Sequence, residues 1–179
     1  MRFFFYGILL DRDVMALALG RRLPPAAYAA AVLRGHARRR AKGASYPTLM
    51  RDPAAYVPGA VVGGLSARDV ARLSAFEGPG YRIVPLQVLM GGGVTTVSVF
   101  EPVESRLKPS PDPWSLGLWQ RRDKRAFVGR LRRAFSGRPA YATLGPSLSV
   151  SSRVTMPIIS RTRIPISTNR MSPDWCASN

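Results

Sequence analysis

The sequence predicts a single α+β domain in which strands and helices follow one another irregularly. With 179 residues, of which 46% are hydrophobic, the chain is long enough to bury one continuous core. Apolar runs typical of strands and stretches of helical periodicity do not form repeated strand-helix units. We therefore expect a sheet with a few helices packed against it.

The first strand and the turn behind it are the most informative part of the chain. Phe3-Phe4-Phe5 is an apolar run typical of a buried strand, and Tyr6-Gly7-Ile8-Leu9 follows it directly. A glycine at this point lets backbone N–H groups approach a ligand with no Cβ in the way. Asp11 to Leu19 then predicts a short helix that ends at Gly20. The pattern predicts an anion-binding turn between the strand and the helix.

The next segments predict two strands joined by a turn. Ala30 to Arg39 has the pattern of a strand and leads to a turn at Lys42-Gly43. Tyr56 to Leu65 is apolar and rich in valine, with Pro58-Gly59 as a bulge or an edge position. We expect both strands to belong to one sheet.

A second helix is predicted by its capping box. The Ser66 hydroxyl can accept a hydrogen bond from the first turn, and Asp69 stands three positions later. Gly78-Pro79-Gly80 ends the helix. The apolar residues of its inward face are Val70, Leu73 and Phe76. The arginines expected to point to water are Arg68 and Arg72.

A hairpin and a third helix complete the predicted domain of residues 1–135. Ile83 to Met90 and Val94 to Phe100 form the hairpin around Gly91-Gly92-Gly93, whose turn type stays open. Trp114 to Phe135 predicts the helix, and its apolar stripe is Trp114, Leu118, Phe127, Leu131 and Phe135. From residue 136 on, Ser, Thr and Pro are frequent, so we expect residues 136–179 to be a basic, flexible tail. The alternative is a short added strand at Val154 to Ile159.

The strongly basic composition raises the question of a nucleic-acid partner. The formal net charge is +17, and clustered Lys and Arg attract phosphates. The densest basic groups, Arg38-Arg39-Arg40 and the stretch Arg121 to Arg133, fall in different predicted elements. Neither is interleaved with aromatic residues that could stack on bases, and no nucleic-acid-binding motif occurs in the sequence. We interpret the charge as solvated surface and do not expect nucleic acid as the partner.

Several other classes of protein are excluded or disfavoured. One cysteine, Cys176, and one histidine, His36, leave no disulfide framework and no zinc site of the usual kind. We interpret His36 as an ordinary exposed or half-buried side chain. The apolar stretch Phe3 to Leu10 is interrupted by Gly7, so it predicts a strand and not a secretion signal, and no stretch is long enough to cross a bilayer. We expect a soluble, cytoplasmic protein.

Glu77 is the candidate general acid or base. It is one of only three glutamates, and it stands at the predicted C-terminal end of its helix, directly after Phe76. The helix dipole and partial desolvation both disfavour a negative charge there, so both raise its pKa toward neutrality. Such a carboxyl group can take and return a proton near pH 7. The alternative is a solvated glutamate at a frayed helix end, which the local sequence by itself slightly favours.

Several short motifs occur in an order that one family shares. They are Tyr6-Gly7-Ile8-Leu9, Tyr46-Pro47, the strand Val57 to Leu65, the segment Leu73 to Gly78 with Tyr81, and Trp114 with Trp119. On these motifs the chain resembles the gamma-glutamylcyclotransferase-like family, which includes the plant avirulence-induced-gene proteins and the gamma-glutamylamine cyclotransferases. The likeness covers roughly residues 1–135. It implies a small mixed β-barrel flanked by helices, with a cavity at its mouth.

The resemblance also implies an activity and a set of site residues. In that family's reaction the α-amine of a γ-glutamyl compound attacks its own γ-carbonyl, and 5-oxoproline and an amine are released with no metal or organic cofactor. Glu77 matches the catalytic glutamate. The expected substrate-binding residues are Tyr6, Gly7, Ile8, Leu9 and Tyr81. The family usually carries Ser or Thr where this chain has Ile8, so a hydroxyl donor is missing there while the backbone donor remains.

Two other functions stay open at this point. The same fold could bind a small carboxylate ligand without turnover, or the basic surface could bind nucleic acid or another acidic surface. Neither the leaving amine nor the oligomeric state follows from the sequence.

Overall fold

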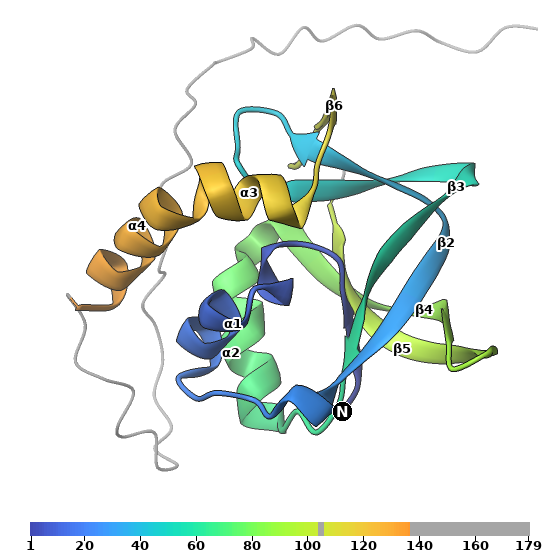
Figure 1. The fold of residues 1–179 in the computed structure, drawn as a ribbon, viewed down its shortest axis with the longest axis horizontal. Coiled ribbons are helices and arrows are strands. Elements are labelled where there is room, and N and C mark those ends of the chain that lie inside the picture. Colours follow the sequence, from blue (N-terminus) through green and yellow to red (C-terminus); the bar gives the residue numbers. More distant parts are fainter. Residues whose placement is uncertain (104–105, 137–179) are drawn as a thin grey trace, which may run out of the picture. The chain divides into compact units, whose positions relative to one another are not determined.

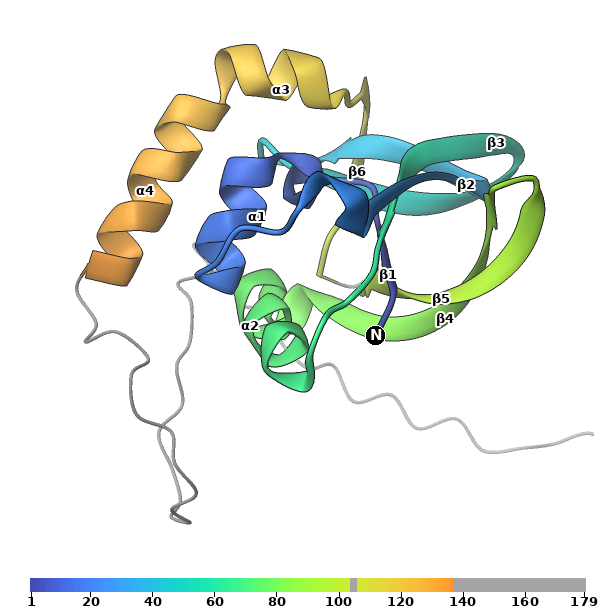
Figure 2. The same cartoon turned by 60° about the horizontal axis from the view of Figure 1, so that its bottom comes forward.

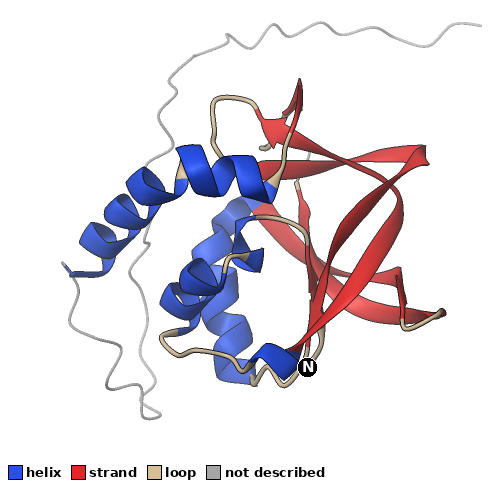
Figure 3. Cartoon of the chain, in the orientation of Figure 1, coloured by secondary structure: helices blue, strands red, loops and turns tan. Residues whose placement is uncertain are grey.

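Five strands of the protein close into a barrel, and the α-helices lie together on one side of it (Figures 1 and 3). The computed structural model describes residues 1–103 and 106–136. Its strands are β1 (Phe3–Phe5), β2 (Tyr28–Ala41), β3 (Pro47–Val62), β4 (Tyr81–Met90), β5 (Gly93–Pro102) and β6 (Pro109–Pro113). Its helices are α1 (Arg12–Leu19), α2 (Ala67–Glu77), α3 (Leu116–Arg122), α4 (Lys124–Ser136) and the short 3₁₀ helices η1 (Ile8–Leu10), η2 (Pro25–Ala27) and η3 (Gly78–Gly80).

The barrel is mixed because β1 pairs in both senses. β1 is antiparallel to β3 and parallel to β5. β4 and β5 form the predicted hairpin, β4 meets β2 where Val32 lies opposite Leu89, and the long antiparallel pair of β2 and β3 closes the circuit. β6 pairs with β2 outside that circuit. The predicted fold class, a small mixed β-barrel flanked by helices, is confirmed.

The two faces of β1 join two hydrophobic clusters. Phe3 and Phe5 pack with Phe100 of β5 in the cluster that the helices cover. Phe4, between them, belongs to the cluster inside the barrel, as does Tyr6 just beyond the strand. Successive side chains of a strand point to opposite faces, so one short strand serves both cores. The other buried members of the barrel cluster are Ala31, Leu33, Leu49, Val57, Val61, Val88, Val97 and Val99.

The predicted end of α1 at Gly20 and the predicted capping box of α2 are confirmed, while Asp11 is the N-cap of α1 and not its first residue. The Asp11 carboxylate accepts hydrogen bonds from the N–H groups of Asp13 and Val14, and α1 ends at Gly20 with φ 68°. Ser66 and Asp69 form the predicted capping box at the start of α2. These two helices lie side by side against the barrel in both views (Figures 1 and 2).

The arginines of α2 differ from the prediction in one position. Arg68 is exposed as expected, but the Arg72 guanidinium donates a hydrogen bond to the Leu19 carbonyl at the end of α1. The last carbonyls of a helix have no partner within it, so an arginine from the next helix satisfies one of them. Arg72 therefore joins the two helices and does not simply point to water.

The third predicted helix is two helices. The Asp123 backbone separates α3 from α4, and Trp114 precedes both. Ser115 caps α3 by accepting from the N–H of Leu118. The Leu118 side chain is 41% exposed, so its place in the predicted apolar stripe is wrong. Trp119 contributes instead, because it is 1% exposed and packs edge to face on Phe127. The prediction assumed one helix with an uninterrupted helical period, and such a pattern does not show where the chain changes direction between two helices.

Gly59 is required by a close contact and is neither a bulge nor an edge residue. It pairs with Ala31 in the middle of β3, and a Cβ on it would lie 2.2 Å from the Phe5 carbonyl oxygen and 2.6 Å from the Phe4 ring. The bulge in this sheet lies in β2 instead, between Arg34 and His36, where Gly35 has φ 72°. β3 itself begins at Pro47, well before the predicted start.

Two further expectations concern the C-terminal tail and membrane-spanning segments. The predicted tail, apart from Ser136, lies outside the described residues, as does its alternative strand at Val154 to Ile159. Among the residues that are described, no helix is both long enough and apolar enough to span a membrane.

We expect Gly59→Ala to destabilise the protein by about 3 kcal/mol, because the new methyl group must push β1 away from β3. Gly63→Ala is the matched control, since a Cβ at Gly63 meets no atom within 4 Å and should cost less than about 1 kcal/mol. Urea unfolding of both variants measures the difference. Equal unfolding midpoints for the two variants would show that the barrel tolerates the close contact.

Candidate active site

The segment after β1 forms a tight turn that leaves two backbone donors without a partner in that turn. Gly7 caps η1, and its carbonyl accepts from the N–H of Leu10 at 3.0 Å. Ile8 and Leu9 are the first residues of this helical turn, so their N–H groups have no carbonyl one turn earlier to bind. A Cβ on Gly7 would lie 3.0 Å from the Pro47 side chain, and the φ of Gly7 is −119°. Close packing against Pro47, and not a left-handed backbone, therefore favours glycine here.

The side chains of this turn face the core. Ile8 is 8% exposed and Leu9 is 2% exposed, and both belong to the cluster covered by the helices. The Tyr6 ring lies in the barrel cluster, and its hydroxyl donates to the Phe100 carbonyl at 2.9 Å. Ile8 and Leu9 can therefore meet a ligand through backbone atoms only.

Glu77 lies at the end of α2 in surroundings that disfavour its charge. Its side chain is half-buried, and burial raises the pKa of its carboxyl group to about 8. The chain turns away directly after it, because Gly78 has φ 70° and continues into η3. No lysine or arginine within the described residues forms an ion pair with Glu77. Desolvation is the cause of the raised pKa, so the partial burial expected from Phe76 is present.

The charge of this carboxyl group influences three tyrosines. Burial first, and then the negative charge of Glu77, raise the pKa of Tyr46 and of Tyr81. Burial also raises the pKa of Tyr6, followed by the influence of Tyr81, Glu77 and Glu101. The Tyr81 hydroxyl lies 3.4 Å from the Pro47 carbonyl, to which it donates. The negative charge of Glu77 therefore influences the pKa of all three phenols.

The structure therefore brings the sequence-predicted residues into one region from three separate parts of the chain. Gly7 of the turn packs on Pro47, and Tyr81 donates a hydrogen bond to the carbonyl of the same proline. Glu77 ends α2 four residues before Tyr81, and its charge influences the pKa of Tyr6 and of Tyr81. Tyr46 was not among the predicted site residues. Its place next to Pro47 in one of the shared motifs was the signal that could have identified it.

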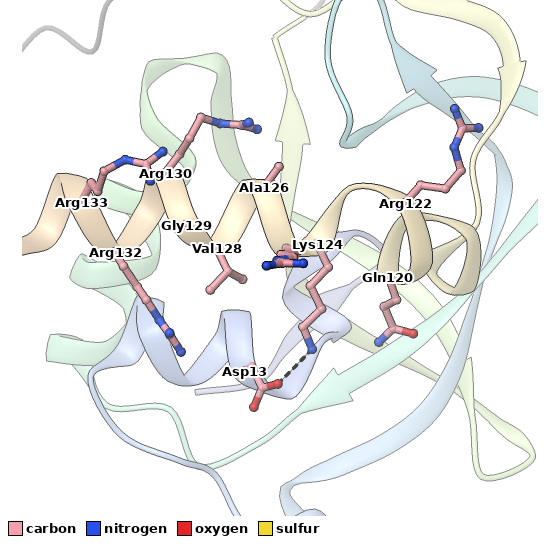
Figure 4. Close-up of a pocket in the computed structure, with 11 residues that line it drawn as sticks. Asp13, Gln120, Arg122, Lys124, Ala126, Val128, Gly129, Arg130, Arg132 and Arg133 are labelled. Carbon is pink, nitrogen blue, oxygen red and sulfur yellow. Dashed lines mark hydrogen bonds and ion pairs between the residues drawn. The ribbon is translucent and has the colours of Figure 1, made fainter.

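Two open hollows on the described surface lie elsewhere. The larger one follows α4 and is bordered by basic side chains, as Figure 4 shows. The smaller one has a volume of about 300 Å³ and is lined by His36, Leu49, Met50, Arg51, Arg82, Glu101, Pro102 and Val103. Neither lining includes Glu77 or the turn after β1. The partly desolvated surroundings of Glu77 are therefore separate from these two surface hollows.

His36 and the remaining acids contribute no metal site. His36 is 7% exposed, so it is buried and not exposed or half-buried as expected, and its Nδ1 lies 3.0 Å from the Arg34 carbonyl oxygen. The β-bulge next to it turns this side chain inward. Within the described part of the chain, no three His, Cys, Asp or Glu side chains gather closely enough to hold a metal ion.

Comparison with known proteins identifies the family. The family model described as "Gamma-glutamyl cyclotransferase, AIG2-like" matches residues 3–121. The chain belongs to this family. The AIG2-like protein C of Arabidopsis thaliana is 31% identical over 128 residues, which cover 70% of this chain and 72% of that protein.

Two solution structures of Arabidopsis thaliana proteins share the fold. One has a TM-score of 0.55 at 24% identity and covers 84% of this chain and 94% of its own. The other has a TM-score of 0.53 at 26% identity and covers 76% of this chain and 91% of its own. Membership of the gamma-glutamyl cyclotransferase family confirms the resemblance drawn from the short motifs.

We expect the protonation of Glu77 to be visible directly. Glutamate labelled with ¹³C at the side-chain carboxyl gives one signal for each of the three glutamates of the chain. One signal should titrate near pH 8 because burial raises that pKa, and the same signal should be missing in Glu77→Gln. If the signal that Glu77→Gln removes has already titrated by pH 6, the carboxyl group is solvated.

Proposed function

We propose that this member of the gamma-glutamyl cyclotransferase family is a cofactor-free cyclotransferase in which Glu77 is the general acid and base. The substrate would be a small γ-glutamyl compound in the cytoplasm, and the products would be 5-oxoproline and an amine. The observation that carries the proposal is the half-buried Glu77 carboxyl group at the end of α2, which has a pKa raised to about 8 and no ion pair among the described residues, and whose charge influences Tyr6, Tyr46 and Tyr81.

The chemistry requires one group that both takes and returns a proton. A bond forms between the α-amine nitrogen and the γ-carbonyl carbon, and the bond from that carbon to the leaving nitrogen breaks. The attacking nitrogen loses a proton, and the leaving nitrogen gains one. A carboxyl group whose pKa lies near the working pH can do both in turn. In the proposed reaction Glu77 takes the first proton as carboxylate and delivers it as the neutral acid.

The turn after β1 supplies the second requirement of the proposed reaction, which is a donor for negative charge. The γ-carbonyl oxygen becomes an oxyanion when the ring closes. Backbone N–H groups of Gly7, Ile8 and Leu9 would stabilise this charge, as fixed donors do in other acyl transfers. Tyr6 and Tyr81 would line the site and keep water from the Glu77 carboxyl group. The hydroxyl groups of both tyrosines already donate to backbone carbonyls, which fixes their rings.

A second candidate, a ligand-binding module without turnover, is favoured by one observation. The Ile8 side chain is buried in the core, so no side-chain donor at this position can assist the reaction. Losing one fixed donor typically lowers kcat by about 10²-fold or more. Turnover and ligand binding therefore have to be measured separately.

We expect Glu77→Gln to lower kcat for 5-oxoproline release by about 10²- to 10⁴-fold, because the amide cannot take up the proton. Glu101→Gln is the matched control. It removes the same charge from a residue that is close enough to influence Tyr6 but is paired with exposed Arg82. A panel of γ-glutamyl amines, γ-glutamyl dipeptides and glutathione, assayed for 5-oxoproline, tests both variants. Equal turnover by Glu77→Gln and Glu101→Gln would remove Glu77 from the mechanism.

Glu77→Gln should also unfold no more readily than the unmodified protein. Folding raises the pKa of this carboxyl group, so the folded state binds the proton more tightly than the unfolded state. Its contribution to the free energy of unfolding therefore falls as pH rises from the ordinary carboxyl range toward pH 8. The neutral amide avoids that loss, so the urea midpoint of Glu77→Gln at pH 8 should equal or exceed that of the unmodified protein. A lower midpoint would mean that the loss of turnover reflects misfolding.

We expect the kcat/KM of the unmodified protein to rise with pH, with a midpoint near pH 8. This ratio reports the ionisation of the free enzyme, and the proton acceptor is the ionised form of Glu77. Steady-state rates between pH 5.5 and 9 measure the profile, and the residual activity of Glu77→Gln should lack the rise. A midpoint below pH 6 would contradict a buried general base.

A further inference from the structure

Arg38 of β2 holds the turn that carries the proposed oxyanion donors. Its side chain is half-buried, and its Nη1 donates to the Tyr6 carbonyl at 2.7 Å and to the Pro58 carbonyl at 3.3 Å. The Tyr6 carbonyl and the Gly7 N–H belong to the same peptide group. The guanidinium of Arg38 therefore lies within one peptide of the backbone donors assigned to the substrate.

The orientation of this guanidinium is fixed from a second side. Its Cζ lies 5.1 Å from the centre of the Trp114 ring. Trp114 is 7% exposed, and its indole N–H donates to the Ser45 carbonyl at 2.9 Å, next to Tyr46. The guanidinium is attracted to the face of the Trp114 ring, which its hydrogen bond to Ser45 keeps in place. A side chain that is already ordered loses little conformational entropy when it binds a ligand.

Arg38 has no acidic partner among the described residues. It differs in this from Arg21, Arg22 and Arg82, each of which forms an ion pair with an acid. Burial lowers the pKa of Arg38, and no nearby carboxylate offsets that effect. Carbonyl oxygens and an indole compensate a half-buried cation only in part, so a carboxylate brought by a ligand would gain an unusually strong interaction.

The unused part of the guanidinium has the geometry for a carboxylate. An arginine has five N–H donors, and the hydrogen bonds to Tyr6 and Pro58 both start from Nη1. Nε and Nη2 together form the parallel pair of donors that binds both oxygens of a carboxylate. Within the described residues, these two atoms donate to no other group.

We propose that Arg38 binds the α-carboxylate of the γ-glutamyl substrate, an inference that rests on the proposed function. Tyr6 is influenced by an acid that forms no ion pair within the described residues, Glu77, and its carbonyl accepts a hydrogen bond from a cation without an acidic partner there, Arg38. An α-amino acid carries the matching pair of charges, an ammonium group and a carboxylate on one carbon. With the carboxylate on Arg38 and the ammonium at Glu77, the turn N–H groups are left for the γ-carbonyl oxygen.

This assignment defines the substrate class. The glutamyl residue must keep a free α-carboxylate, whereas the group on the γ-nitrogen makes no contact with Arg38 and is unrestricted by it. γ-Glutamyl compounds whose α-carboxylate is blocked as an amide or ester should bind poorly.

Binding of 5-oxoproline and of 5-oxoprolinamide, measured by calorimetry, tests the assignment. The two probes differ only in the carboxylate that Arg38 would hold. The unmodified protein should bind 5-oxoproline about 10- to 100-fold more tightly than the amide, since a bidentate charged contact is lost. In Arg38→Met this ratio should fall to about 1, and Arg38→Lys, which keeps the charge without the paired donors, should lie between.

Arg39→Met is the matched control, because Arg39 is the neighbouring residue and its Nη1 donates to Pro111 outside the site. It should leave the ratio of the two affinities unchanged. If Arg38→Met does not fold, the ratio in Arg38→Lys decides the question. The proposal is overturned if the unmodified protein fails to prefer 5-oxoproline, or if the Arg38 variants weaken both probes equally, which is the result expected of a residue that only positions the turn.

The assay separates this inference from the proposed function. Preference for 5-oxoproline that depends on Arg38, without release of 5-oxoproline from any γ-glutamyl compound, supports the carboxylate site and rejects the cyclotransferase. Turnover that is equally fast on a substrate with an amidated α-carboxyl group supports the cyclotransferase and rejects the role of Arg38.

Discussion

The position of β1 between two strands and two hydrophobic cores is the constraint on which the rest of the structure depends. β3 and β5 occupy both of its edges, while Phe3 and Phe5 face the helices and Phe4 faces the barrel. A shift of one residue would exchange the two faces and place Tyr6 outside the barrel. Gly59 adds a second restriction, because the Phe5 carbonyl lies where its Cβ would be. The register of β1 therefore fixes where the following turn begins.

From this fixed strand, two neighbouring segments complete the candidate site. Pro47 at the start of β3 packs on Gly7 and accepts the hydrogen bond from Tyr81 at the start of β4. α2 ends at Glu77, and only the short helix η3 separates it from Tyr81 at the start of β4. The charge of Glu77 raises the pKa of Tyr81 in addition to burial. The close spacing of these three chain segments removes water from the carboxyl group, and this desolvation is the origin of its raised pKa.

Several acids of the described residues have a structural role in ion pairs and helix caps. Asp11, Asp13, Asp69 and Glu101 are each paired with a lysine or an arginine, and Asp11 and Asp69 also cap helices. Asp52, Asp112, Asp123 and Glu77 form no ion pair among the described residues, so a missing partner does not by itself single out Glu77; its position at the end of α2 and the burial that raises its pKa do. Glu77 is left without an ion pair among the described residues, and Arg38 is its basic counterpart. Pairing stabilises the fold, whereas groups left unpaired and half-buried retain interaction energy for a ligand.

The sequence determined the elements whose causes are local. The alternation of β1, the caps at Asp11, Ser66 and Gly20, and the hairpin around Gly91-Gly92 all depend on residues that are neighbours in the chain. The family also followed from short motifs, and with it the barrel and the candidate residues Tyr6 to Leu9, Glu77 and Tyr81.

Only the tertiary structure decided which distant residues meet. The role of Gly59 depends on a strand more than fifty residues away, the break at Asp123 depends on how Trp119 and Phe127 pack, and the burial of His36 depends on a bulge. Arg38 belongs to a basic run that local reasoning assigns to solvent, yet it donates a hydrogen bond to the carbonyl of Tyr6, which is 32 residues away in the chain. Hydrophobic periodicity and capping act over a few residues, whereas desolvation and pairing of charges are set by contacts between segments far apart in sequence.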